Sequence, residues 1–105
     1  MVIIETSIFT RQVQQFLSDD DYRHLQLELI RRPEQGKIIP GSGGLRKIRW
    51  APTGRGKSGA LRTIYFWAVS DEIIFMLYIY TKNELENLSG DQLKLLRKII
   101  KEEFK

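Results

Sequence analysis

The 105-residue sequence has no cysteine, a single histidine and no long hydrophobic run. Without cysteine the chain can form no disulfide, no thiolate metal site and no thiol nucleophile. One histidine, His24, argues against a zinc site of the usual kind. The longest apolar stretch, Ile73 to Tyr80, is far shorter than the about 20 residues of a membrane-spanning helix. With no signal-peptide pattern at the N-terminus, we expect a soluble, cytoplasmic protein.

The composition is that of one globular domain covering residues 1–105. A hydrophobic fraction of 42% is sufficient for a core, and no repeats or separate linkers interrupt the chain. The net charge is +4 and the isoelectric point is near 9.5. A basic protein of this kind is expected to bind nucleic acid or an acidic protein partner.

The positive charge is concentrated in the middle of the chain. From Arg31 to Arg62 the only anion is Glu34, so the rest of the chain is acidic on balance. The cations of this stretch are Arg31, Arg32, Lys37, Arg46, Lys47, Arg49, Arg55, Lys57 and Arg62. Such a concentration attracts phosphate-rich partners, although the charges could also form a solvated sheet face. Lys47 and Arg49 stand two apart and share one face of a strand, which favours a prepared site.

Hydrophobic periodicity predicts an α+β protein. A short N-terminal strand precedes two helices that form an antiparallel hairpin, and Pro33 and Gly36 end the second helix. A connector, residues 37–44, leads into an antiparallel meander of three strands, and a helix closes the chain. The expected elements are strand Met1–Glu5, a helix from about Ile8, helix Asp20–Arg32, strands Leu45–Trp50, Leu61–Trp67 and Ile73–Thr81, and a helix from Ser89. We expect the helical hairpin to cover one side of a small sheet, with Tyr22, Leu25, Leu29 and Ile30 as the apolar stripe of its second helix.

Two patterns that suggest ligand sites have simpler explanations. Gly56-Lys57-Ser58 resembles the end of a phosphate-binding Walker motif, but Ala51 stands where that motif requires glycine. The three aspartates at 19–21 could hold a metal, but a helix N-terminus already accounts for them. Neither pattern therefore indicates a nucleotide or metal site.

The last strand of the meander ends in polar groups. Tyr78, Tyr80 and Lys82 have the same parity and so point to one face. Both tyrosines could be core rings with their hydroxyls satisfied at the edge. Tyr80 lies close to Lys82 in the sequence, so its hydroxyl could equally well belong to a polar site.

Four segments, in this order and spacing, resemble the RelE/ParE toxin superfamily in its HigB-like branch. They are GGLRKIR, the Gly-rich basic loop after Trp50, LRTIY and YTKNE. Members are toxins of bacterial type II toxin–antitoxin pairs, and the resemblance extends over nearly the whole chain. It implies the RelE-like fold, a small antiparallel sheet packed by an N-terminal helical hairpin, with a C-terminal helix.

The resemblance also implies a ribosome-dependent mRNA endoribonuclease that inhibits translation. In this chemistry the 2′-hydroxyl attacks the adjacent phosphate, without metal or cofactor, and leaves a cyclic phosphate. By position, Arg49 and Arg62 match arginines that would clamp the phosphate, and Lys47 and Lys82 match candidates for proton transfer. Some RelE members carry a tyrosine after the last strand. No tyrosine follows Tyr80 in this sequence. Either Tyr80 takes the place of that tyrosine, or this branch cleaves RNA without one.

The remaining basic residues are expected to hold RNA. Lys57, in the loop, is placed nearer the chemistry and joins the expected catalytic set. Arg55, Arg46 and Lys37 are expected to bind the RNA backbone. The full catalytic expectation is Lys47, Arg49, Lys57, Arg62, Tyr80 and Lys82, with no metal ligand.

The implied partners are a cognate antitoxin, of the helix-turn-helix type in the HigB-like branch, mRNA in the ribosomal A site, and ribosomal RNA. Two other functions remain open from the sequence. A ParE-like gyrase poison belongs to the same superfamily but lacks the basic catalytic set. A non-catalytic RNA-binding module would use the basic face alone, and the basic stretch has neither a histidine nor a carboxylate pair to argue against it.

Overall fold

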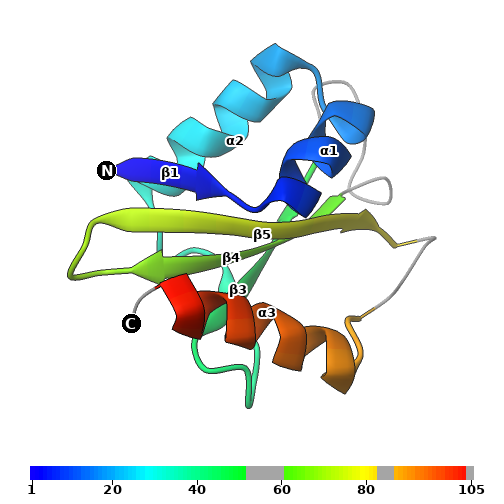
Figure 1. Cartoon of the computed structure of the whole chain (residues 1–105). Coiled ribbons are helices and arrows are strands. Elements are labelled where there is room, and N and C mark those ends of the chain that lie inside the picture. Colours follow the sequence, from blue (N-terminus) through cyan, green and yellow to red (C-terminus); the bar gives the residue numbers. More distant parts are fainter. Residues whose placement is uncertain (52–60, 83–86, 104–105) are drawn as a thin grey trace.

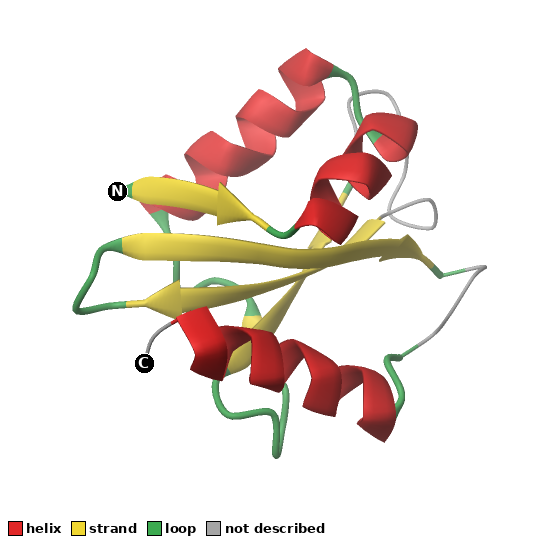
Figure 2. Cartoon of the chain, in the orientation of Figure 1, coloured by secondary structure: helices red, strands yellow, loops and turns green. Residues whose placement is uncertain are grey.

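The computed structural model describes residues 1–51, 61–82 and 87–103. Its elements follow the predicted order, with one additional short strand (Figures 1 and 2). They are β1 (Val2–Glu5), α1 (Ser7–Phe16), α2 (Asp19–Arg31), β2 (Lys37–Ile38), β3 (Leu45–Trp50), β4 (Leu61–Ala68), β5 (Ile73–Thr81) and α3 (Gly90–Glu103).

One five-stranded sheet runs through the molecule in the order β1-β5-β4-β3-β2. The antiparallel meander β3-β4-β5 is confirmed. At one edge β1 adds in parallel to β5, and at the other β2 adds antiparallel to β3. The expectation that residues 37–44 form only a connector is wrong at its start, because Lys37 and Ile38 pair with β3. A two-residue strand has too little periodicity to show in the sequence.

Local capping explains where the helices begin. The Thr6 hydroxyl accepts a hydrogen bond from the Phe9 amide (3.0 Å) at the start of α1. The Ser18 hydroxyl does the same for α2, and the three aspartates follow in the first turn, where the helix dipole favours them. Ser89, directly before α3, and Gln92, in its first turn, exchange two hydrogen bonds, which is a capping box.

Helices cover both faces of the sheet. The α1–α2 hairpin packs on one face, as predicted, and α3 packs on the other, so the core has two clusters (Figure 1). In α2, Leu25 and Leu29 are fully buried, but Ile30 is 39% exposed. Including Ile30 in the apolar stripe was therefore wrong. One residue turns a helix by about 100°, which carries Ile30 out of the contact with the sheet.

A buried tyrosine fixes the chain between α2 and β2. The Tyr65 hydroxyl donates to the Pro33 carbonyl (2.7 Å) and accepts from the Gly36 amide (2.9 Å). A Cβ at Gly36 would lie 2.6 Å from that hydroxyl oxygen, so the close approach requires glycine. This anchor places Lys37, the first residue of β2, beside β3.

Candidate nucleic-acid interface

Three of the predicted residues form a row across the sheet. Arg49 on β3 lies directly opposite Arg62 on β4, and Arg62 lies directly opposite Tyr80 on β5. Residues directly opposite in antiparallel strands point to the same face, with Cβ atoms about 4.5–5.5 Å apart. The row is on the face that α3 covers, as the packing of Tyr80 against that helix shows.

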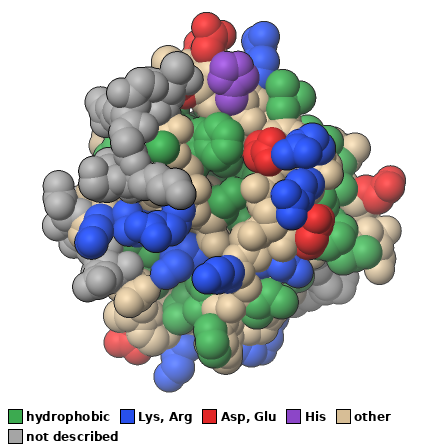
Figure 3. Space-filling model, turned by 180° about the vertical axis from the view of Figure 1, so that it is seen from behind, with side chains coloured by type: hydrophobic (Ala, Val, Ile, Leu, Met, Phe, Trp, Pro, Cys, Tyr) green, Lys and Arg blue, Asp and Glu red, His purple; other side chains and the backbone are tan. Residues whose placement is uncertain are grey.

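A second basic row lies next to the first. Lys37 on β2 is directly opposite Lys47 on β3, and Lys47 is directly opposite Ile64 on β4. Lys47 and Arg49 therefore share a face, as the sequence predicted. We call Lys37, Lys47, Arg49 and Arg62 the basic cluster. Viewed from behind, Figure 3 shows one group of Lys and Arg side chains on the left of the face, while other basic side chains lie among acidic ones on the right and one lies beside the histidine at the top.

The Arg49–Arg62 pairing places two like charges directly opposite each other. Like charges directly opposite on neighbouring strands destabilise a sheet. Arg62 is only 6% exposed, whereas Arg49 is exposed. In the part of the chain that the structure describes, neither Arg49 nor Lys47 forms an ion pair with a carboxylate. Two guanidinium groups on one face can bind the oxygens of one anion together, so the arrangement fits a phosphate site.

Lys47 is held by a residue that the sequence did not single out. Its ammonium group donates to the Asn87 side-chain oxygen at 2.9 Å. Forty positions separate the two residues, so periodicity and strand pairing could not have joined them. The only hint was the place of Asn87 three residues beyond the end of the YTKNE segment.

A pocket of about 140 Å³ opens beside this pair, between β3, β4, β5 and the start of α3. Aliphatic side chains form most of its wall, and three polar residues complete it. The lining residues are Ile39, Lys47, Ile64, Tyr80, Asn87, Leu88 and Leu93.

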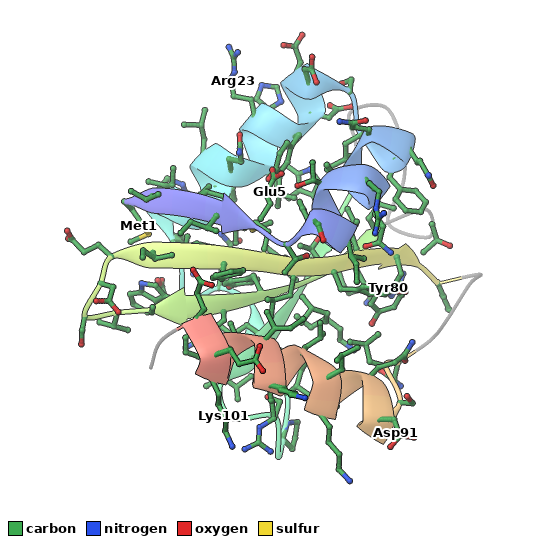
Figure 4. All side chains as sticks on the ribbon, viewed as in Figure 1. Met1, Glu5, Arg23, Tyr80, Asp91 and Lys101 are labelled. Carbon is green, nitrogen blue, oxygen red and sulfur yellow. The ribbon has the colours of Figure 1, made fainter. Side chains whose placement is uncertain are left out.

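Tyr80 is the buried member of this pocket. It is 1% exposed, and its hydroxyl has no hydrogen-bond partner among the described residues. Figure 4 shows its side chain near the end of β5, on the side of α3. Burial raises the pKa of Tyr80, and the nearby charge of Arg62 opposes that rise. The hydroxyl therefore stays protonated at neutral pH and can donate a hydrogen bond.

The other predicted residues lie in three places. Lys82 is exposed just beyond β5, at the end of the sheet where Arg62 and Tyr80 lie. Arg55 and Lys57 fall outside the described residues. Arg46 points to the opposite face, where its guanidinium donates to the backbone carbonyls of Glu34 (2.9 Å) and Gly36 (2.8 Å). The structure thus separates Arg46 from the basic cluster and gives it a role in holding the α2–β2 connection.

Two further observations concern the described residues alone. Within residues 1–51, 61–82 and 87–103, no three His, Cys, Asp or Glu side chains lie close enough to hold a metal ion. No helix in the same part of the chain has the length and apolar character needed to cross a bilayer.

Comparison with known proteins identifies the family. The model of the RelE family, described as the RelE toxin of the RelE/RelB toxin–antitoxin system, matches residues 1–105. Among solved structures, the free Escherichia coli toxin RelE, as a double arginine-to-alanine mutant, superposes with a TM-score of 0.58 at 13% identity, covering 81% of this chain and 86% of that one. A chain of the intact E. coli RelBE toxin–antitoxin complex gives 0.55 at 12% identity, covering 74% and 92%. At such identities these structures show the shared fold. The family match spans the whole chain, which therefore belongs to the RelE family of toxins of toxin–antitoxin systems.

Proposed function

We propose that this toxin is an endoribonuclease that cleaves mRNA in the ribosomal A site and so inhibits translation. The observation that carries the proposal is the Arg49–Arg62 pair, two arginines directly opposite on neighbouring strands, one of them buried. That geometry brings two guanidinium-bearing side chains to one face of the sheet and suits a phosphodiester bound by both. RNA presents such a group at every nucleotide.

The two arginines stabilise the transition state in this proposal. Attack by the 2′-oxygen forms a new bond to phosphorus and adds negative charge to its oxygens before the bond to the 5′-oxygen breaks. A guanidinium can bind two of these oxygens at once. Donors fixed in advance at the developing charge lower the barrier more than flexible ones do.

Two protons must move during the reaction. The 2′-hydroxyl loses one, and the departing 5′-oxygen gains one, so the products are a 2′,3′-cyclic phosphate and a 5′-hydroxyl. We assign these transfers to Lys47 and Lys82, and no step uses a metal. Tyr80 keeps its proton at neutral pH and acts as a hydrogen-bond donor, because burial raises its pKa.

A cognate antitoxin is the second expected partner. The structural relatives include a chain from a toxin–antitoxin complex. We propose that the antitoxin of this chain is of the helix-turn-helix type, as the HigB-like resemblance suggests, and that it covers the basic cluster. The proposed target, mRNA on ribosomes, places the toxin in the cytoplasm.

Primer extension on a translated message after brief expression in bacteria tests the proposal. We expect new 5′ ends within the coding sequence. Arg49→Ala should lower their yield by about 10²–10³-fold, the usual effect of removing one fixed transition-state donor. Arg49 is exposed, so this change should leave the fold intact, whereas Arg62→Ala alters a buried position. Arg23→Ala, an exposed arginine on α2, is the matched control and should cut like the wild type.

The other outcomes separate the alternatives. Growth arrest without new RNA ends would point to a ParE-like gyrase poison. Neither arrest nor cleavage would leave a non-catalytic RNA-binding module as the better account. Equal cleavage by Arg49→Ala, Arg62→Ala and the wild type would refute the assigned site.

A further inference from the structure

Lys47 lies among other cations on its face of the sheet. Lys37 is directly opposite on β2, and Arg49 lies two residues further along β3 on the same face. Like charges placed in this way repel each other. A lysine side chain is also a flexible four-carbon stem, so an unheld ammonium group would occupy many positions. Lys47 can take a defined part in proton transfer only if another group holds it in place.

Asn87 holds this ammonium group. Its side-chain oxygen accepts a hydrogen bond from the Lys47 nitrogen at 2.9 Å. An ammonium group has three N–H donors, so two remain after this contact. Within the described part of the chain, neither of these two has a protein partner. The contact with Asn87 therefore orients Lys47 and leaves donors for the oxygens of a substrate.

The group that holds Lys47 is a neutral amide. Asn87 therefore orients the ammonium group without cancelling the positive charge that an anionic substrate would meet. A carboxylate at the same position could accept the same hydrogen bond, but it would neutralise that charge and stabilise the protonated form of the lysine. A group that exchanges a proton in catalysis works best when neither of its forms is strongly favoured. An amide meets both requirements.

The chain that follows Asn87 is held by packing and by a helix cap. Leu88 packs against the core cluster on the α3 side of the sheet. Ser89 comes next and forms the capping box with Gln92 at the start of α3. The Asn87 side chain is exposed, and its one hydrogen bond with the described residues is the bond to Lys47. Asn87 thus reaches Lys47 from a fixed part of the fold.

We propose that Asn87 is a positioning residue, which holds the Lys47 ammonium group beside the phosphate site of Arg49 and Arg62. It acts through Lys47 and needs no contact with the RNA. Lys47 either accepts the 2′ proton as a neutral amine or supplies the 5′ proton as an ammonium, and Asn87 keeps its own protons in both cases. This inference rests on the proposed function and adds to it a residue from outside the basic cluster.

Single-turnover cleavage of a message on purified ribosomes, with the toxin in excess, tests this role. Asn87→Ala should lower the maximal rate about tenfold and change the toxin concentration at half-maximal rate by less than about twofold, because a misplaced catalytic group slows the chemical step and leaves binding intact. Asn87 is exposed, so the fold should persist, which thermal unfolding checks. Gln14→Ala, at an exposed amide on α1, is the matched control and should cut at the wild-type rate.

A double variant separates positioning from other effects of Asn87. Lys47→Ala should lower the rate by about 10²-fold or more, the usual contribution of a proton-transfer group. If Asn87 acts only through Lys47, adding Asn87→Ala to Lys47→Ala should change the rate by less than about twofold. An effect of Asn87 on the fold or on ribosome binding would instead add to the effect of Lys47→Ala.

Asn87→Asp gives a readout that a purely structural role would not move. The carboxylate keeps an acceptor oxygen and adds a negative charge, which stabilises the protonated lysine. The limb of the pH–rate profile that Lys47 causes should therefore move to higher pH, by roughly 0.2–0.7 unit for an exposed pair. The direction is the same whether Lys47 acts as the base or as the acid, because either limb follows its protonation.

Three results would each overturn the role of Asn87. They are a wild-type rate in Asn87→Ala, a further loss of rate when Asn87→Ala is added to Lys47→Ala, and a pH–rate profile that Asn87→Asp leaves in place. If Asn87→Ala unfolds, the profile of Asn87→Asp decides. In all of these cases the wild type still cuts, so the proposed nuclease stands. No cleavage by the wild type would instead refute the proposed function, and the role of Asn87 with it.

Discussion

Two tyrosines of the sheet, Tyr65 and Tyr80, should respond in opposite ways to the same chemical change. Both are almost fully buried. The Tyr65 hydroxyl makes two hydrogen bonds, to Pro33 and Gly36, whereas the Tyr80 hydroxyl makes none with the described residues. Replacing each tyrosine by phenylalanine removes only the hydroxyl and retains the ring.

The magnitude follows from the groups left behind. Tyr65→Phe leaves the Gly36 amide and the Pro33 carbonyl without their partner, and each unsatisfied buried group costs about 1–3 kcal/mol. We expect a loss of about 2–6 kcal/mol in the free energy of unfolding. For a domain of this length that lowers the melting temperature by roughly 10–35 °C.

Tyr80→Phe is the matched control. It removes a hydroxyl that has no partner, so the free energy of unfolding should stay the same or rise by up to about 1 kcal/mol. Urea unfolding at pH 7, followed by circular dichroism, measures both variants against the wild type. Both variants lose one tyrosine hydroxyl. The difference between their free energies of unfolding therefore measures the cost of the backbone groups that Tyr65→Phe leaves unsatisfied.

A comparable loss of stability in both variants would refute this reasoning. It would mean that the Tyr80 hydroxyl has a partner in the folded protein. A loss below about 1 kcal/mol for Tyr65→Phe would show that water replaces the tyrosine at the α2–β2 connection.

Three further predictions follow from named contacts. Arg46→Ala should lower the melting temperature in thermal unfolding, because the two hydrogen bonds from Arg46 to backbone carbonyls are lost. Unlike Arg49→Ala, it should retain mRNA cleavage in primer extension. Thr6→Ala removes the α1 cap and should cost about 1–2 kcal/mol in urea unfolding. The pKa of Tyr22 is raised, chiefly by burial and then by its hydrogen bond to the Glu5 carboxylate. The folded state therefore holds this proton more tightly, so stability is retained below about pH 10 and falls as pH rises further, with a shallower fall in Tyr22→Phe.

The sequence by itself determined the class of the protein and the parts of the fold that depend on local pattern. Alternating and helical periodicity placed the three meander strands and both helices of the hairpin within a residue or two. Strand parity put Lys47 and Arg49 on one face, because side chains alternate strictly along a strand. The motif segments indicated the RelE superfamily, and the family match confirmed it at that level.

Only the tertiary structure decided which segments meet. Strand parity also placed Arg46 on the face of the sheet opposite to Lys47 and Arg49. Only the arrangement of the helices showed that α1 and α2 pack on that face. The parallel pairing of β1 with β5 and the contact between Lys47 and Asn87 join residues distant in sequence. No local propensity encodes such contacts, because they depend on how the hairpin and α3 fold over opposite faces of one sheet.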